Sequence, residues 1–185
     1  MTARPVVSVF GSASVPEGSP LYSDGMRLGS GLAQSGFDVA TGGYGGLMEA
    51  VSRGASEGGA HVLGFTCDRL EVWRPVQPNA WIHEQIRCSS LRERVVRLIE
   101  AGQALVALPG GVGTLSEIAL SWSMLQTGEL TPRPMLLVGE AWRRTIDEFL
   151  ERAATHVRPA DVQWVTLVPD VDAALTALPP FGTGR

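Results

Sequence analysis

Residues 108–117 read Leu-Pro-Gly-Gly-Val-Gly-Thr-Leu-Ser-Glu and directly follow the apolar run Ala104–Ala107. The segment after them has helical spacing, so the order along the chain is strand, glycines, helix. Glycine lets a backbone approach an anion closely, and the first N–H groups of a helix point towards that anion. This order predicts a phosphate-binding loop, with the carboxylate of Glu117 held beside whatever the phosphate is attached to.

A second glycine cluster has the same layout. Residues 41–50 read Thr-Gly-Gly-Tyr-Gly-Gly-Leu-Met-Glu-Ala and lie between a short β-branched run and a helical segment. In doubly wound sheets, ligands bind at the carboxyl ends of the strands, where such loops gather. The two loops are therefore candidates for surrounding one nucleoside monophosphate, although a tight strand-to-helix connection also explains the second. This loop lacks the GxGxxG spacing and the following acidic residue of a dinucleotide site.

Short apolar runs alternate with longer segments of helical spacing along the chain. Because parallel strands need crossover connections, this alternation predicts an α/β fold, a doubly wound and mainly parallel sheet of about six to seven strands with helices on both faces. No linker or repeat divides residues 1–185, which are expected to form a single domain with a loose tail at 179–185. The predicted strands are 6–10, 37–41, 61–65, 104–108, 135–138 and 164–168. The predicted helices are 21–35, 47–57, 90–101, 115–127, 142–154 and 170–178, and residues 66–81 are expected to be an irregular loop over the site.

Composition and charge exclude several classes of protein. A net charge of −4 and a pI near 5.4 argue against nucleic-acid binding, which needs a basic face. No apolar run approaches the ~20 residues of a membrane helix, and the N-terminal run is too short for a signal peptide. The two cysteines, Cys67 and Cys88, provide no disulfide framework. We therefore expect a cytoplasmic protein that binds neither nucleic acid nor membranes.

The absence of lysine restricts the chemistry, because all 15 basic residues are arginines. Without lysine, the chain cannot bind pyridoxal phosphate or a carbonyl substrate as a Schiff base. A GxxxxGK phosphate loop is excluded for the same reason. Anions must therefore be bound by backbone N–H groups, hydroxyl groups or arginine. The three histidines, His61, His83 and His156, show no metal-ligand spacing.

The two glycine loops resemble the signatures of the Lonely Guy family. Residues 109–117 are similar to its PGGxGTxxE motif, and residues 42–50 are similar to its GGGxxGxMxA loop. The similarity is colinear over residues 6–130 and includes Ser12, in the loop after the first strand. Family members also carry an arginine fifteen positions before the signature proline, and here 109 − 15 = 94 gives Arg94. The next residue is Val95 where the family has lysine. The glycine loop at 42–50 is one residue shorter than the commonest form of that loop in the family.

The resemblance implies a Rossmann-like fold that typically forms homodimers. It also implies a phosphoribohydrolase that acts on N6-modified adenosine 5′-monophosphates and releases a free base and ribose 5-phosphate. By resemblance, Arg94 and Glu117 are the catalytic residues. In these two departures the chain resembles the more divergent bacterial members of the family, including a branch related to molybdenum-cofactor carrier proteins. The alternative function is therefore that of a non-catalytic carrier or sensor of a nucleotide or of that cofactor. The expected nucleotide-binding residues are Ser12, Gly42, Gly43, Gly45, Gly46, Met48, Gly110, Gly111, Gly113 and Thr114.

The chemistry of N-glycosidic cleavage agrees with these roles on independent grounds. Breaking the bond builds positive charge on C1′ and the ring oxygen of the ribose. A carboxylate such as Glu117 stabilises that charge or takes a proton from the attacking water. A guanidinium such as that of Arg94 suits bidentate contact with a phosphate or with the carboxylate. Backbone N–H groups of the glycines and the Thr114 hydroxyl are expected to bind the 5′-phosphate, and the scheme needs no metal or cofactor.

Structural explanations of the same residues are left open by the sequence. Thr114 and Glu117 have the spacing of a capping box, in which threonine caps the helix and glutamate reaches back to the cap. The arginines at 92, 94 and 97 also fit a solvated helix face that pairs with neighbouring glutamates. Trp73 and Trp81, in the predicted irregular loop, are candidates for covering a purine but are not assigned as ligands.

Overall fold

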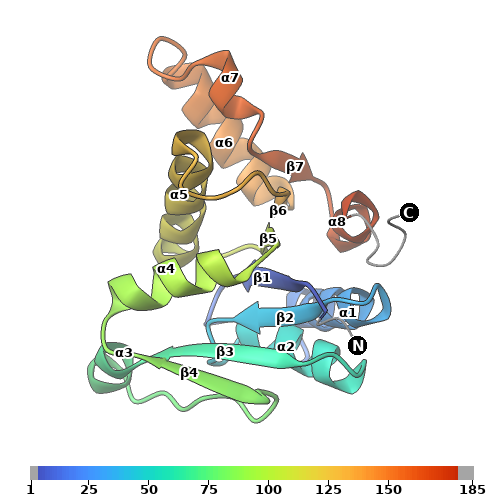
Figure 1. The fold of residues 1–185 in the computed structure, drawn as a ribbon. Helices are drawn as coiled ribbons and strands as arrows, with labels where there is room; N and C mark the ends of the chain where they lie inside the picture. Colours follow the sequence, from blue (N-terminus) through green and yellow to red (C-terminus); the bar gives the residue numbers. More distant parts are fainter. Residues whose placement is uncertain (1–3, 179–185) are drawn as a thin grey trace.

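One seven-stranded parallel sheet, in the order β4-β3-β2-β1-β5-β6-β7, forms the centre of the computed structural model, which describes residues 4–178 (Figure 1). The predicted doubly wound, parallel architecture is therefore confirmed. From β1 the chain adds strands outwards to β4 and then returns to place β5 on the other side of β1. The strand order reverses between β1 and β5, which is where such sheets bind ligands. The strands are β1 (Val6–Phe10), β2 (Asp38–Thr41), β3 (Val62–Cys67), β4 (Glu84–Cys88), β5 (Ala104–Ala107), β6 (Met135–Val138) and β7 (Thr166–Val168).

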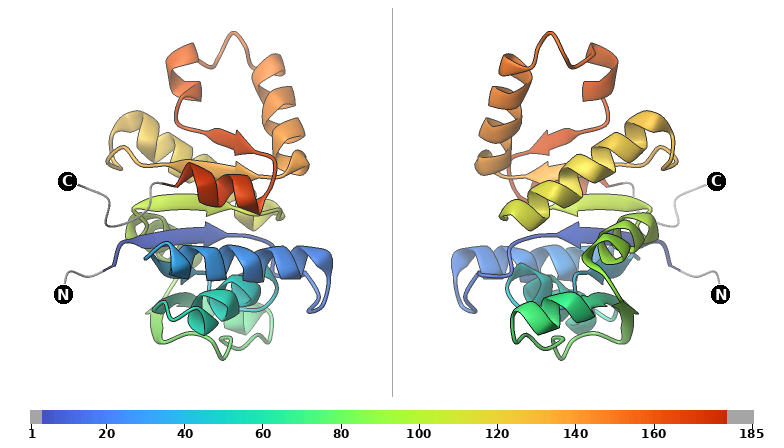
Figure 2. Two further views of the ribbon diagram at one scale, coloured as in Figure 1. Left: turned by 90° about the vertical axis from the view of Figure 1, so that its right-hand side faces the viewer. Right: turned by 90° about the vertical axis from the view of Figure 1, so that its left-hand side faces the viewer.

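Helices cover both faces of the sheet, and each face has its own apolar core (Figure 2). The central strand β1 contributes to both cores, because successive side chains of a strand point to opposite faces. Val7 and Val9 pack with one set of helices, whereas Phe10 packs with the other. The first set consists of α1 (Pro20–Gln34), α2 (Leu47–Glu57) and α8 (Val171–Ala177), and the second of α4 (Leu91–Ala101), α5 (Val112–Thr127) and α6 (Glu140–Arg152).

The glycines of α1 and α2 let these two helices approach each other backbone to backbone. A Cβ atom at Gly29 of α1 would clash with the carbonyl of Val51 in α2. A Cβ atom at Gly54 of α2 would likewise clash with the carbonyl of Met26 in α1. Glycine costs helix propensity, so these positions are explained by packing against the partner helix. The close pair fixes the start of α2, and with it the glycine loop at 42–46.

Two elements near the site were not predicted. Residues 66–81, expected to be irregular, contain the helix α3 (Asp68–Trp73), and the strand β4 follows at the edge of the sheet. β4 has the sequence Glu-Gln-Ile-Arg-Cys and mostly exposed side chains, so the apolar pattern that reveals a buried strand is absent. The short helix α7 (Pro159–Val162) was also missed. The predicted tail at 179–185 lies outside the described residues.

The helix after the signature glycines begins earlier than predicted, at Val112 instead of 115. Gly111 is the N-cap residue in an extended conformation, and the Leu115 N–H donates to its carbonyl at 2.9 Å. This shift by three residues decides how Thr114 and Glu117 are interpreted below. Across residues 4–178, no helix combines the length and apolarity that crossing a membrane requires.

Candidate active site

A pocket of about 280 Å³ lies at the carboxyl ends of the strands, beside the reversal point between β1 and β5. Its size is close to the lower end of the ~300–1,000 Å³ range of small-molecule pockets. Loops after β1 and β5, the loop and helix after β2, helices α3, α4 and α5, and the segment after α3 all contribute to it. The lining residues are Gly11, Ser12, Ala13, Ser14, Tyr44, Met48, Leu70, Trp73, Arg74, Val76, Arg94, Gly111, Gly113, Thr114 and Glu117.

Hydrogen bonds join the loops after β1, β2 and β5 into one unit. The Ser12 N–H donates to the Pro109 carbonyl at 3.1 Å, and the Leu47 N–H donates to the Ser12 carbonyl at 2.8 Å. Gly46 has a φ of 70°, and a Cβ atom there would lie 2.5 Å from the Ser12 carbonyl oxygen. Only glycine satisfies both requirements, since other residues rarely adopt this φ and would collide with the neighbouring loop. The two glycine clusters of the sequence therefore do meet at one edge of the sheet.

Thr114 and Glu117 do not form a capping box. Thr114 lies within the first turn of α5, and no side chain caps this helix at Gly111. The Thr114 side chain packs against Gly110, where a Cβ atom would clash with its hydroxyl oxygen. Glu117 is buried and faces Arg94 of α4 instead of reaching back to the helix start. At Gly111 and Gly113 the space around an added Cβ atom is open, so these two positions leave room for a ligand.

Arg94 is buried to 6% exposure and does not belong to a solvated helix face. Its Nε donates to the carbonyl of Phe65, within β3, at 2.6 Å. Its Nη2 donates to the Gly42 carbonyl at 3.0 Å, and a Cβ atom at Gly42 would clash with that nitrogen. The glycine at 42 is thus required by the arginine. The Gly43 N–H donates to Thr41 Oγ1 at 3.2 Å, so that N–H is already engaged within its own loop.

Glu117 and Arg94 form a loosely coupled pair. Arg94 Nη1 lies 3.9 Å from Glu117 Oε1, and the two side chains are 7% and 9% exposed. Burial raises the pKa of Glu117 to about 7, because removing the carboxylate from water disfavours its charge, and Arg94 only partly offsets this effect. A carboxyl group that titrates near neutral pH is suited to take up a proton during a reaction. Among the described residues, no three His, Cys, Asp or Glu side chains gather as a metal site would require.

The predicted residues divide into those that line the pocket and those that shape its loops. Glycines 42, 43, 45, 46 and 110 do not line it and act through the loop backbone. Sequence reasoning did not assign Tyr44, Leu70, Arg74 and Val76, although Tyr44 lies inside the second motif. Residues 66–81 were expected to lie over the site, with Trp73 as a candidate for covering a purine, but the helix α3 within them was not predicted. The lining residues that were predicted are Ser12, Met48, Arg94, Gly111, Gly113, Thr114 and Glu117.

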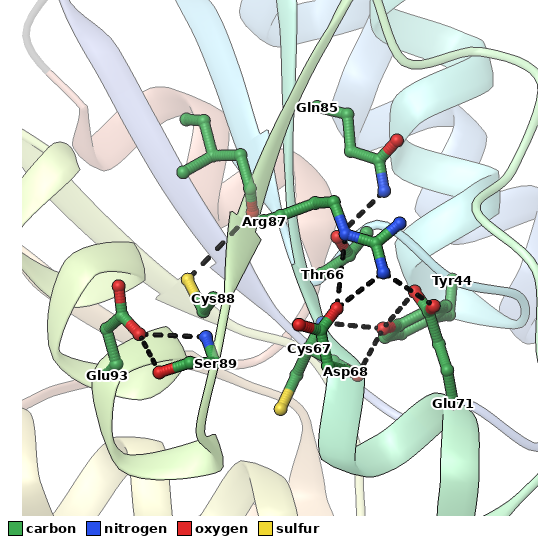
Figure 3. A network of polar contacts seen from close by, with 11 residues as sticks. Tyr44, Thr66, Cys67, Asp68, Glu71, Gln85, Arg87, Cys88, Ser89 and Glu93 are labelled. Atoms are coloured by element: carbon green, nitrogen blue, oxygen red, sulfur yellow. Dashed lines mark hydrogen bonds and ion pairs between the residues drawn. The ribbon is translucent and has the colours of Figure 1, made fainter.

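Helix α3, one wall of the pocket, is tied to the glycine loop through Tyr44 (Figure 3). The Tyr44 hydroxyl accepts the Cys67 N–H at 2.7 Å and donates to Glu71 Oε1 at 3.1 Å. Burial raises the pKa of Tyr44, so this hydroxyl remains a donor at neutral pH. Arg87 of β4 pairs with Asp68 and Glu71, so α3 is also held from the edge strand. The Tyr44 ring lies 5.7 Å from the Arg94 guanidinium, which connects the wall to the buried pair.

Comparison with known proteins assigns the family. A family model described as "Possible lysine decarboxylase" matches residues 48–178. The chain belongs to this family. It is the Lonely Guy family that the two glycine motifs resemble.

Three similar proteins illustrate how far the similarity extends. A cytokinin riboside 5′-monophosphate phosphoribohydrolase from Rhodococcoides fascians is 28% identical in an alignment 185 positions long, which covers 95% of this chain and 91% of that protein. The Arabidopsis thaliana protein of the same description, LOG2, is 30% identical over 122 residues, 64% of this chain and 56% of its own. A pyrimidine/purine nucleotide 5′-monophosphate nucleosidase from Escherichia coli K12 is 27% identical, and this chain spans 37% of its length.

Solved structures with the same fold include two proteins of a different description. The molybdenum cofactor binding protein from Rippkaea orientalis superposes with a TM-score of 0.73 at 18% identity, over 95% of this chain and 96% of the other. The molybdenum cofactor carrier protein from Chlamydomonas reinhardtii gives 0.70 at 23% identity, over 94% and 95% of the two chains. Similarity at this level establishes the fold of the Lonely Guy member described here.

The tie between α3 and the glycine loop predicts the effect of Tyr44→Phe. The substitution leaves the buried Cys67 N–H without its acceptor, which costs about 1–3 kcal/mol. We expect the free energy of unfolding, measured by urea denaturation, to fall by that amount. Tyr22→Phe is the matched control, because the buried Tyr22 hydroxyl makes no hydrogen bond of normal geometry among the described residues and has only charged side chains such as Arg53 nearby, so its removal should cost less. Equal losses in both variants would contradict the role given to the Tyr44 hydroxyl.

Proposed function

We propose that the chain hydrolyses the N-glycosidic bond of a nucleoside 5′-monophosphate, AMP or an N6-modified AMP, and releases the free base and ribose 5-phosphate. The observation that carries this proposal is the buried Glu117, which faces Arg94 in a pocket bounded by two glycine loops and the start of α5. A carboxylate has a high cost of burial, so its place beside an open pocket calls for a chemical explanation.

The reaction assigns separate tasks to the two ends of the pocket. The start of α5 exposes Gly111, Gly113 and Thr114 to the pocket, and Ser12 lies beside them, bonded to the Pro109 carbonyl. Unpaired N–H groups at a helix start attract a phosphate, and hydroxyl groups add further donors. A 5′-phosphate bound there would place the ribose beside Glu117. Arg94 contributes the positive charge that keeps Glu117 partly ionised at neutral pH.

Glu117 then acts on C1′ of the ribose. As the bond between C1′ and the base nitrogen breaks, its electron pair leaves with the base, and positive charge develops on C1′ and the ring oxygen. The ionised carboxylate stabilises this charge and accepts a proton from the water that attacks C1′. The water oxygen becomes the 1-hydroxyl of ribose 5-phosphate, and the departing base takes up a proton. This scheme uses only side chains that line the pocket.

The relatives support a nucleotide substrate. The proteins from Rhodococcoides fascians and Arabidopsis thaliana are described as phosphoribohydrolases of cytokinin riboside monophosphates, and the Escherichia coli protein as a nucleotide nucleosidase. Lysine decarboxylation, which the family description names, finds no support here, since the chain has no lysine to bind pyridoxal phosphate. The molybdenum-cofactor proteins share the fold at 18% and 23% identity, which carries no argument about function.

We also propose that the chain forms homodimers through the outer surface of α4, α5 and α6. The large apolar residues Leu91, Val112, Leu115, Leu120 and Phe149 are 36% to 81% exposed there. An apolar groove of about 400 Å³ between α5 and α6 adjoins them. Exposed apolar surface of this kind marks protein interfaces. Sedimentation equilibrium should give twice the chain mass of 19.7 kDa, and a monomer at micromolar concentration would contradict the dimer.

Incubation with a panel of nucleoside 5′-monophosphates tests the activity. We expect chromatography to detect free base and ribose 5-phosphate, with a rate that rises with pH through about 7 as Glu117 loses its proton. Glu117→Gln keeps the shape but cannot accept a proton, so the rate should fall by roughly 10²–10⁴-fold while the nucleotide still binds. Binding of AMP by the native protein without any release of base would overturn the proposal and favour a carrier or sensor.

A further inference from the structure

The pocket has an apolar end that the reaction scheme does not use. Leu70 and Trp73 of α3 and Val76 after it give this end its apolar surface, and the exposed Arg74 between Trp73 and Val76 is its charged residue. We infer that this wall recognises the base of the nucleotide and that the Trp73 indole stacks on it, which makes Trp73 the residue that selects planar aromatic bases. The inference rests on the proposed nucleotide substrate but concerns only its base.

The order of the strands sets the orientation of the ligand. Ser12 follows β1 and the α5 residues follow β5, whereas α3 follows β3, two strands away from β1. Neighbouring strands lie about 4.8 Å apart, so the end of β3 is roughly 10 Å from that of β1 and roughly 14 Å from that of β5. Arg94 lies between them, bound to the carbonyl of Gly42, which follows β2, and to that of Phe65 within β3. A phosphate at the polar end thus directs the ribose to the buried pair and the base to α3.

Trp73 is suited to this role by its exposure. Trp73 is 77% exposed although it lines the pocket, so most of its apolar surface faces solvent and part of it borders the pocket. A tryptophan left in water forgoes the large stabilisation that its burial normally provides. Stacking on a base would recover part of it, and any base with a planar π face is accepted. Trp81, the other tryptophan of this segment, does not line the pocket and lies under the Arg53 guanidinium at 5.3 Å.

The wall that carries Trp73 is held in place before a ligand arrives. Figure 3 shows Glu71 bound to the Tyr44 hydroxyl, and Asp68 bound to Arg87 of the edge strand. These contacts fix both turns of a helix that is only six residues long. A fixed aromatic surface binds more tightly than a mobile one, because less conformational entropy is lost on binding. The same tyrosine ring borders Arg94, so the base wall and the buried pair share one support.

Binding measurements on Trp73→Ala test the inference. In a Glu117→Gln background, which prevents turnover, the Kd of AMP should rise roughly 5- to 150-fold, as base–aromatic stacking implies. The Kd of ribose 5-phosphate, which has no base, should stay within about twofold, because it contacts only the polar end. Trp73→Phe keeps an aromatic ring and should restore most of the AMP affinity. Val72→Ala is the matched control, since Val72 is 85% exposed on the same helix but does not line the pocket.

The outcomes separate this inference from the proposed function. If Trp73→Ala weakens AMP and not ribose 5-phosphate, the base wall is supported, whether or not the native protein releases base. If base is released normally and Trp73→Ala leaves the Kd and KM of AMP unchanged, the base wall is overturned and the activity stands. Equal weakening of both ligands, or no measurable binding of any nucleotide by the native protein, also overturns it.

Discussion

The guanidinium of Arg94 is the interaction on which the site depends. It lies inside the protein and donates to the carbonyls of Gly42 and Phe65 while facing Glu117. These groups come from the loop after β2, from β3 and from α5, so one side chain sets the distance between the glycine loop, the sheet and the carboxylate. Arginine suits this position because its planar fork offers several donors in fixed directions. The absence of a side chain at Gly42 is what allows the guanidinium to approach the loop.

Glu117 shows the balance between burial and charge in this arrangement. At 3.9 Å from Arg94 Nη1 it is attracted to the arginine but makes no hydrogen bond to it, and burial prevails in setting its pKa. Removing one partner from a buried pair typically costs about 3–5 kcal/mol, since the other charge is left alone. The pair therefore maintains the site in the folded protein, and the raised pKa gives the carboxyl group a proton affinity suited to neutral pH. The same buried pair of Arg94 and Glu117 thus maintains the site and sets the pKa of Glu117.

Much of the fold could be predicted from the sequence, because buried parallel strands read as continuous apolar runs between helical segments. The six predicted strands appear in the sheet, and the two glycine loops meet as expected. β4 was missed since an edge strand with polar residues has no apolar run, and α3 was missed since six residues show no helical period. The glycines of α1 weakened its helical pattern, yet the structure shows that they serve close packing against α2.

The motifs of the candidate site were predicted, and residues 66–81 were expected over it, but the helix α3 that forms this wall was not. The pairing of Arg94 with Glu117 followed from their spacing relative to the family signature, and geometry brings them together. The capping-box interpretation was wrong because α5 starts at Val112, which places Thr114 inside the first turn. Local spacing cannot reveal such a shift, since an extended glycine at 111 starts the helix without a side-chain cap. The contribution of Leu70 and Arg74 depends on tertiary contacts that no local pattern encodes.

Direct titration of the Glu117 carboxyl group is the measurement that tests this account most directly. Isotope-edited infrared spectroscopy, with labelled glutamate and a Glu117→Gln difference spectrum, resolves its protonated C=O band as pH is varied. Burial beside Arg94 predicts a midpoint at about 7. A midpoint near the ordinary value of 4.5 would show that Glu117 is solvated or tightly paired, and would contradict the buried, reactive carboxylate on which the site is built.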